Sequence, residues 1–149
     1  MLGEITLVSS VNTPIKVQIV QGDLTQENTD AVVNPTNQFG QLVKGLGAQI
    51  LYFGGATIQE EVNEIVKTEG LIPTGNVIET GSGILRTKHI IHAVGPDYNC
   101  PSQIGLDKSK LLTFTARNVY SKASSLNCSS ISLPAISCGA FGFPRRDCA

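Results

Sequence analysis

The sequence has no tryptophan, a single methionine and two histidines, and aromatic residues make up 5% of its 149 positions. It also lacks an excess of charge, since 11 Lys and Arg residues oppose 12 Asp and Glu for a net charge of −1. Proteins that follow a nucleic-acid backbone carry a basic stripe, so we expect no direct binding to duplex nucleic acid. A ligand phosphate would be held by backbone N–H dipoles rather than by a cationic patch.

Long hydrophobic runs are missing as well. No stretch reaches about 18 consecutive apolar residues, the length that indicates a membrane span. The N-terminus does not join a basic region to an apolar one, as a secretory signal would. We therefore expect no membrane partner and a location in the cytoplasm, the nucleus or both.

Cysteine and histidine are poorly spaced for metal binding. The four cysteines include no C-x-x-C pair, and the two histidines alternate within one expected strand. We expect no metal, no cofactor and reduced thiols. Cys138 lies in a glycine-rich turn, where either a lowered thiol pKa or simple tolerance of a small residue explains its presence.

Apolar runs and turn signals alternate along the chain. Helical patterns cover 47–53, a segment that ends near Gly70, and 112–126. The expected strands are 4–8, 15–21, 30–34, 76–80, 89–94 and 130–136, the first two joined by a turn around Asn12-Thr13-Pro14. This alternation predicts one α/β domain over residues 1–149, with a largely parallel sheet covered on both faces.

Residues 132–144 read as a buried strand that breaks into a glycine-punctuated turn. Small residues let the main chain approach a phosphate closely, and such a turn points N–H groups at an anion. A simple chain reversal would look the same.

Four segments in order resemble the macrodomain family, and they extend over most of the chain. They are VQGDLT (20–25) with AVVNPTN (31–37), then IPTGNV (72–77), HIIHAVGP (89–96) and the turn at 132–144, which resembles the family's phosphate loop. The pattern is most similar to the macrodomains attached to antiviral poly-ADP-ribose polymerases. The resemblance implies a three-layer α/β/α sandwich with a mixed, largely parallel sheet.

The resemblance also implies a ligand, ADP-ribose, and partners that are mono- or poly-ADP-ribosylated proteins. The resemblance implies that the fold continues beyond the position of Ala149 through a helix into one more strand. We therefore expect a C-terminally truncated macrodomain that lacks the last helix and strand of the fold.

Strand ends locate the site, because ligands of open α/β sheets bind beyond the carboxyl ends of strands. Asp23 follows one such end and could accept an N–H bond from a base or cap a short helix. The resemblance implies that Asp23 receives the adenine amine, with the Leu24 N–H nearby. Asn37 could bind ribose hydroxyls or close its own turn. The resemblance implies that Asn37 faces the distal ribose, and we expect Asn34 to be a structural turn residue.

The phosphate loop supplies most of the remaining predicted ligand contacts. Phe141 is expected to project toward the distal ribose, or to plug the core beneath the loop. Phe143 and Pro144 are expected to start the next helix. The predicted ligand-binding residues are Asp23, Leu24, Asn37, Gly45, Leu46, Ser137, Cys138, Gly139, Ala140, Phe141 and Gly142.

The sequence departs from the family pattern before residue 47. Of the usual glycine run only Gly45 remains, and Val43 and Lys44 would crowd the approach to the ribose and diphosphate. Lys44 could instead offer its ammonium to phosphate or face solvent.

Hydrolases of the family carry an acidic residue near the start of the helix expected at 47–53. Residues 46–50 contain no acidic residue, and Gln49 is too weak a base to activate water. We therefore predict an ADP-ribose reader. The alternatives are a weak mono-ADP-ribosyl hydrolase, in which Asn37 would be the catalytic residue, and a degenerate macrodomain that serves only as a protein-interaction module.

Overall fold

The structure is a computed structural model that describes residues 1–8 and 13–149, so the predicted turn at Asn12 lies outside the described residues. The elements in chain order are β1 (Gly3–Val8), β2 (Pro14–Ile19), η1 (Leu24–Gln26), β3 (Ala31–Pro35), α1 (Gly45–Gly54), α2 (Thr57–Glu69), β4 (Val77–Gly81), β5 (His89–Ala93), η2 (Pro101–Gln103), α3 (Lys108–Ser125), β6 (Ile131–Ser132) and α4 (Arg145–Cys148).

Four strands form the central sheet in the order β4-β5-β3-β6. β3 runs parallel to both β5 and β6, whereas β4 runs antiparallel to β5. Ala31, Val32 and Val33 of β3 are at most 1% exposed, which explains why this strand reads as an unbroken apolar run. The predicted mixed α/β sheet is confirmed.

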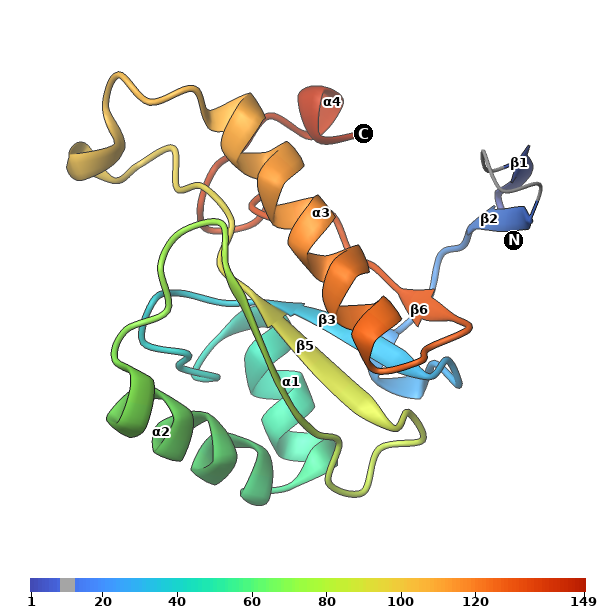
Figure 1. Cartoon of the computed structure of the whole chain (residues 1–149), viewed down its shortest axis with the longest axis horizontal. Coiled ribbons are helices and arrows are strands. Elements are labelled where there is room, and N and C mark those ends of the chain that lie inside the picture. Colours follow the sequence, from blue (N-terminus) through green and yellow to red (C-terminus); the bar gives the residue numbers. More distant parts are fainter. Residues whose placement is uncertain (9–12) are drawn as a thin grey trace.

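Helices cover both faces of this sheet (Figure 1). On one face, Val119 and Ala123 of α3 pack with β3 and β5, and Leu112 and Leu126 border the same cluster. On the other face, α1 and α2 contribute Leu46, Ile50, Ile58 and Val62 to a second cluster around Ile90. The apolar stripes predicted for α2 and α3 therefore face the sheet, and the three-layer arrangement follows.

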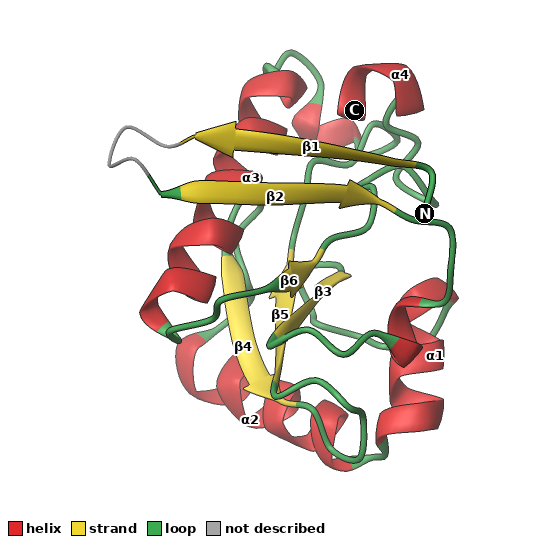
Figure 2. Cartoon of the chain, turned by 90° about the vertical axis from the view of Figure 1, so that its right-hand side faces the viewer, coloured by secondary structure: helices red, strands yellow, loops and turns green. Residues whose placement is uncertain are grey.

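β1 and β2 form a separate antiparallel hairpin (Figure 2). One face of the hairpin is apolar, with Ile5 opposite Val17 and Leu7 opposite Ile15, and these four side chains are 38–54% exposed. On the other face Lys16 pairs with Glu4 at 3.2 Å. Within the described chain, no ladder joins this hairpin to the four-stranded sheet.

Two predicted strand boundaries were wrong. The strand expected at 130–136 is only Ile131–Ser132, because β6 pairs with β3 alone and Pro134 has no N–H to extend a ladder. The strand expected at 15–21 ends at Ile19, before Gly22. The helix that carries the apolar face at 112–126 starts at Lys108, where the Asp107 carboxylate accepts from the Lys110 N–H as an N-cap.

Candidate functional site

Asp23 caps the short helix η1. Its Oδ1 accepts from the Thr25 N–H at 2.9 Å and from the Thr25 hydroxyl at 2.7 Å. These two bonds, the hydroxyl one first, lower the pKa of the exposed carboxyl below its usual range. Both bonds end on Oδ1, and Oδ2 accepts no hydrogen bond from the residues described. Asp23 is thus fixed as a carboxylate with one oxygen open to a ligand, and Leu24 begins the helix that it caps.

Asn37 closes the turn that follows β3. Its Oδ1 accepts from the N–H groups of Phe39 at 3.0 Å and Gln41 at 3.3 Å, and its own carbonyl accepts from the Gly40 N–H at 2.9 Å. Its Nδ2 donates a long 3.4 Å bond to the Gln41 side chain. The turn-closing role is therefore present in this structure. The contact with the distal ribose stays a prediction, and it would use the weakly held Nδ2.

Asn34 was expected in a turn, and this was wrong. It lies within β3, fully buried, and its Nδ2 is 3.0 Å from His92 Nδ1. His92 Nε2 is 2.9 Å from the Thr80 hydroxyl, which itself donates to the Gly81 carbonyl. His92 therefore donates from Nε2 and accepts at Nδ1 as a neutral ring, and burial lowers its pKa to about 4. This buried chain fixes β3, β5 and β4 relative to one another.

The loop that lacks the glycine run turns its side chains outward. Val43 is 69% exposed and Lys44 is exposed at the N-cap of α1, with no capping bond from its side chain. Gly45 has φ of +60° and open space where a Cβ would be, while Leu46 packs into the core. The sequence analysis did not identify a role for Gly47. A Cβ at this position would lie 3.2 Å from the Leu42 Cα, which is closer than an ordinary contact. The role of Gly47 is to let α1 pack closely on this loop.

The phosphate loop, residues 137–142, is a compact turn held by its own backbone. The Phe143 N–H donates to the Ser137 carbonyl at 2.9 Å, and the Gly142 N–H donates to the Gly139 carbonyl at 3.0 Å. Ser137 has φ of +65° and Gly142 has φ of +68°, so the chain turns through the left-handed region at both ends of the loop. The three N–H groups between them, of residues 139–141, donate to no group in the described chain. They are available to an anion.

Residues 95–99 support this loop from the side. The Tyr98 N–H donates to the Phe141 carbonyl at 2.8 Å, and Asn99 Nδ2 donates to the Ala140 carbonyl at 2.9 Å. Gly95 touches the Ser137 side chain so closely that an added Cβ would overlap its Oγ. These supports were not recognised in the sequence, because only the fold brings residues 95–99 beside the loop.

Phenylalanines 141 and 143 have different roles. Phe143 is 2% exposed and its ring meets that of Tyr98 edge to face, 4.9 Å between centroids, so it anchors the loop in the core. Phe141 is half-buried. Pro144 is the N-cap of α4 rather than its first helical residue.

Buried side-chain oxygens without hydrogen-bond partners occur near the carboxyl end of β3 and in the phosphate loop. Thr36 Oγ1 follows β3, and Ser137 Oγ begins the phosphate loop; both are buried and have no hydrogen-bond partner among the residues described. Asn34 Oδ1 is also buried and has no hydrogen-bond partner among the residues described. Buried hydroxyls of this kind are normally satisfied by water or ligand atoms. Their positions agree with a polar site beyond the carboxyl end of β3.

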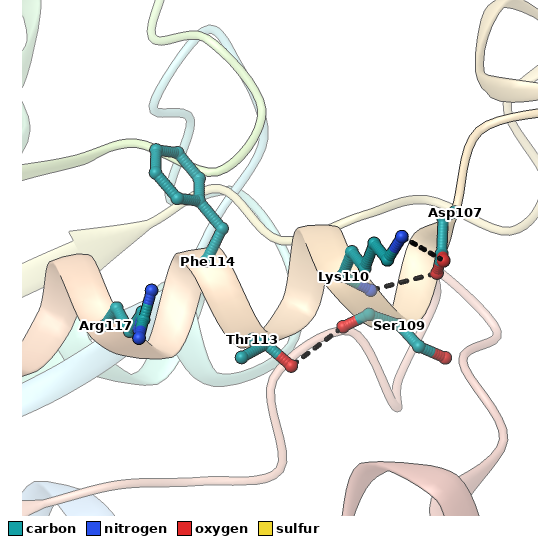
Figure 3. A pocket seen from close by; sticks show the side chains of 6 residues that line it. All are labelled: Asp107, Ser109, Lys110, Thr113, Phe114 and Arg117. Atoms are coloured by element: carbon teal, nitrogen blue, oxygen red, sulfur yellow. Dashed lines mark hydrogen bonds and ion pairs between the residues drawn. The ribbon is translucent and has the colours of Figure 1, made fainter.

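The structure joins some of the predicted site residues and not others. Contacts link the phosphate loop to residues 95–99 and η1 to α1. No hydrogen bond in the described part joins Asp23 to the phosphate loop. A hollow of about 380 Å³ lies elsewhere, on the outer surface of α3, and contains none of the predicted residues (Figure 3). It is lined by Asp107, Ser109, Lys110, Thr113, Phe114 and Arg117.

Neither a metal site nor a membrane helix is found in the described chain. Among residues 1–8 and 13–149 there is no group of three or more His, Cys, Asp or Glu side chains that could hold a metal ion. In the same ranges no helix is both long and apolar enough to cross a bilayer.

Comparison with known proteins identifies the family. The macro domain family profile matches residues 33–149. An uncharacterized protein of Thermotoga maritima is 41% identical over 88% of this chain, which spans 21% of that protein. The protein mono-ADP-ribosyltransferase PARP9 of Mus musculus is 36% identical over 90% of this chain, which spans 16% of its length.

Among solved structures, a variant of the Oceanobacillus iheyensis macrodomain, determined with ADPR, superposes with a TM-score of 0.79 at 30% identity. The superposition covers 95% of this chain and 75% of that one. The chain therefore belongs to the macro domain family and is related to the PARP macrodomains.

Proposed function

We propose that this chain is a binding module that recognises ADP-ribose, free or attached to proteins. The observation that carries the proposal is the likeness, over 95% of the chain, to a macrodomain determined with ADPR. The exposed N–H groups of residues 139–141 support it, since three consecutive donors suit a diphosphate. The Asp23 carboxylate, with Oδ2 open, is suited to accept the adenine amine.

Charge distribution agrees with recognition through the backbone. The phosphate loop itself contains no Lys or Arg, and Lys44 lies exposed on a different loop. Dipoles of the N–H groups of residues 139–141 would then hold the phosphates.

A reader fits the chain better than a hydrolase. The first turn of α1 contains no acidic residue, and Gln49 is exposed on that helix. Asn37 Oδ1 already accepts two backbone N–H groups, so it is held away from the role of orienting a water molecule. We infer that bound ADP-ribose is retained rather than released from its carrier protein.

Calorimetric titration with ADP-ribose tests the proposal, and Asp23→Ala is the decisive variant. We expect Asp23→Ala to weaken binding roughly 10- to 100-fold, as for loss of a hydrogen bond to a charged group. Asp107→Ala is the matched control, because it removes an equivalent exposed N-cap from α3. Unchanged affinity in folded Asp23→Ala would refute the adenine assignment.

Two further outcomes separate the alternatives. Absence of any heat with the parent protein would favour an interaction module without ADP-ribose. Release of ADP-ribose from a mono-ADP-ribosylated protein, lost in Asn37→Ala, would instead establish a hydrolase.

A further inference from the structure

Two neighbouring residues hold successive carbonyl groups of the phosphate loop. Asn99 Nδ2 donates to the Ala140 carbonyl at 2.9 Å, and the Tyr98 N–H donates to the Phe141 carbonyl at 2.8 Å. In the described chain no other group donates to the Ala140 carbonyl. The orientation of the peptide unit that joins Ala140 to Phe141 therefore depends on the Asn99 side chain.

The bond from Asn99 determines where the Phe141 N–H points. A trans peptide unit is planar, with its C=O and N–H groups pointing in opposite directions, and Ala140 is joined to Phe141 by such a unit. Asn99 holds the C=O, so the N–H points away from Asn99, and it donates to no group in the described chain. The next N–H along the chain, that of Gly142, is already bonded to the Gly139 carbonyl.

The Asn99 amide is itself held in place. The Asn99 N–H donates to Asp97 Oδ1 at 2.8 Å, and the Asp97 N–H donates to Gln103 Oε1 at 2.9 Å. Gln103 Nε2 in turn donates to the Thr74 hydroxyl at 3.3 Å. Gly142 leaves the space that the amide occupies, since a Cβ there would lie 3.1 Å from Asn99 Nδ2. The donor therefore belongs to a turn that several hydrogen bonds fix relative to the phosphate loop.

Local stability does not explain this arrangement. Asn99 and Ala140 are both exposed, so water would satisfy the amide and the carbonyl if their bond were absent. A neutral hydrogen bond of this kind adds little to the free energy of unfolding. What the bond changes is the direction of one of the three N–H groups, of residues 139–141, that are available to an anion.

We propose that Asn99 is a positioning residue, which directs the Phe141 N–H toward the diphosphate of the ligand. The ligand is that of the proposed function, on which this proposal rests. Without the Asn99 donor, the peptide unit is free to rotate and to turn its carbonyl oxygen toward the ligand. A carbonyl oxygen repels a phosphate oxygen, whereas an N–H binds it. Binding of the anion should therefore weaken although every N–H of the loop is still present.

Nuclear magnetic resonance and calorimetry test this role with two probes, inorganic pyrophosphate and ADP-ribose. In the parent chain both probes should move the Phe141 amide proton downfield, as a bond to a phosphate oxygen does. In Asn99→Ala the dissociation constants of both should rise about 10-fold, near the lower limit for losing a hydrogen bond to a charged group. At saturating ADP-ribose the Phe141 shift should be smaller in this variant, while the shifts caused outside residues 95–99 and 137–142 stay as in the parent.

Asn118→Ala is the matched control. Asn118 Nδ2 donates to the Gly75 carbonyl at 2.8 Å, so this variant also removes a bond from an Asn side chain to a backbone carbonyl, but on α3. It should bind both probes as the parent does. Asn99→Asp keeps the shape of the side chain and lacks the donor, so it should bind at least as weakly as Asn99→Ala. Both Asn99 variants should keep the urea midpoint of the parent, which separates loss of direction from loss of folding.

Three results would overturn the proposal: pyrophosphate that leaves the amides of residues 139–141 unchanged in the parent, parent-like binding by either Asn99 variant, or an equal loss in Asn118→Ala. Pyrophosphate also separates this proposal from the proposed function. If pyrophosphate binds the loop and weakens in Asn99→Ala, but ADP-ribose does not bind the parent, the role of Asn99 stands and the proposed function fails. If ADP-ribose binds the parent and Asn99→Ala equally, the proposed function stands and the role of Asn99 is refuted.

Discussion

Lowering the pH should destabilise this protein through one residue, His92. Its ring is fully buried and neutral, accepting from Asn34 and donating to Thr80. The pKa of His92 is lowered from 6.5 to about 4 by burial. Between these two values the unfolded chain takes up a proton that the folded chain excludes. The free energy of unfolding therefore falls as the pH drops through 6.5, and the decline from this group ends near pH 4.

The size of the effect follows from the two pKa values. Each pH unit between the two pKa values corresponds to about 1.4 kcal/mol, so the free energy of unfolding should fall by about 3 kcal/mol once His92 is protonated in both the folded and the unfolded chain. Between pH 7 and pH 5 the loss should be about 2 kcal/mol. Most carboxylates stay ionised in this window, so their titration adds little.

Urea denaturation at pH 7 and pH 5 measures this loss, and the second histidine provides the control. His92→Gln has no titrating ring, so it should be less stable at pH 7 and lose most of the pH dependence. His89→Gln should keep the dependence, since His89 is only half-buried and bonds to Glu79 at the edge of the sheet. A loss below about 0.5 kcal/mol in the parent, or a full loss in His92→Gln, would refute the reasoning.

Two other predictions concern the candidate site and the sheet edge. Replacing Val43 and Lys44 together by glycine should tighten ADP-ribose binding a few-fold in calorimetry by restoring close backbone approach; weaker binding would mean that Lys44 contacts phosphate. Asp30→Asn should lower the urea midpoint at pH 7, because Asp30 accepts from Lys88 and from two groups of Ser129 at 2.7–2.8 Å. These bonds lower the pKa of Asp30, so their stabilisation is lost as the pH falls below about 4, and the variant should decline less than the parent between pH 5 and pH 3. Equal declines would contradict this role.

Local chemistry made much of the fold predictable. Gly70 ends α2 with φ of +89°, and the apolar stripe of α3 faces the sheet, as the spacing in the sequence indicates. The length of β6 was not predictable, because it depends on which neighbours pair with it. An apolar run such as 130–136 does not show that only one side is paired.

The candidate site also has features that the sequence predicted and features that it did not. The turn at Gly139 and the cap at Asp23 were visible as residue types at strand ends. The close approach of Gly95 to Ser137 was not, since the two are far apart in the sequence and meet only after β5 and the phosphate loop are in place. Ser137 also adopts a left-handed φ that its residue type does not suggest.

The β1–β2 hairpin divides the protein into regions that open at different free energies. The backbone hydrogen bonds of the hairpin ladder join only its own two strands, and nearly all of its side chains are exposed. In hydrogen exchange its amides should therefore report local opening, while those of β3, with paired neighbours on both sides, report opening of the whole sheet. Asp23 follows the hairpin directly and the phosphate loop follows β6, so a ligand that bridges them would link a weakly protected region to a strongly protected one. Slower exchange across β2 on addition of ligand would then measure how much of the binding free energy is used to order the hairpin.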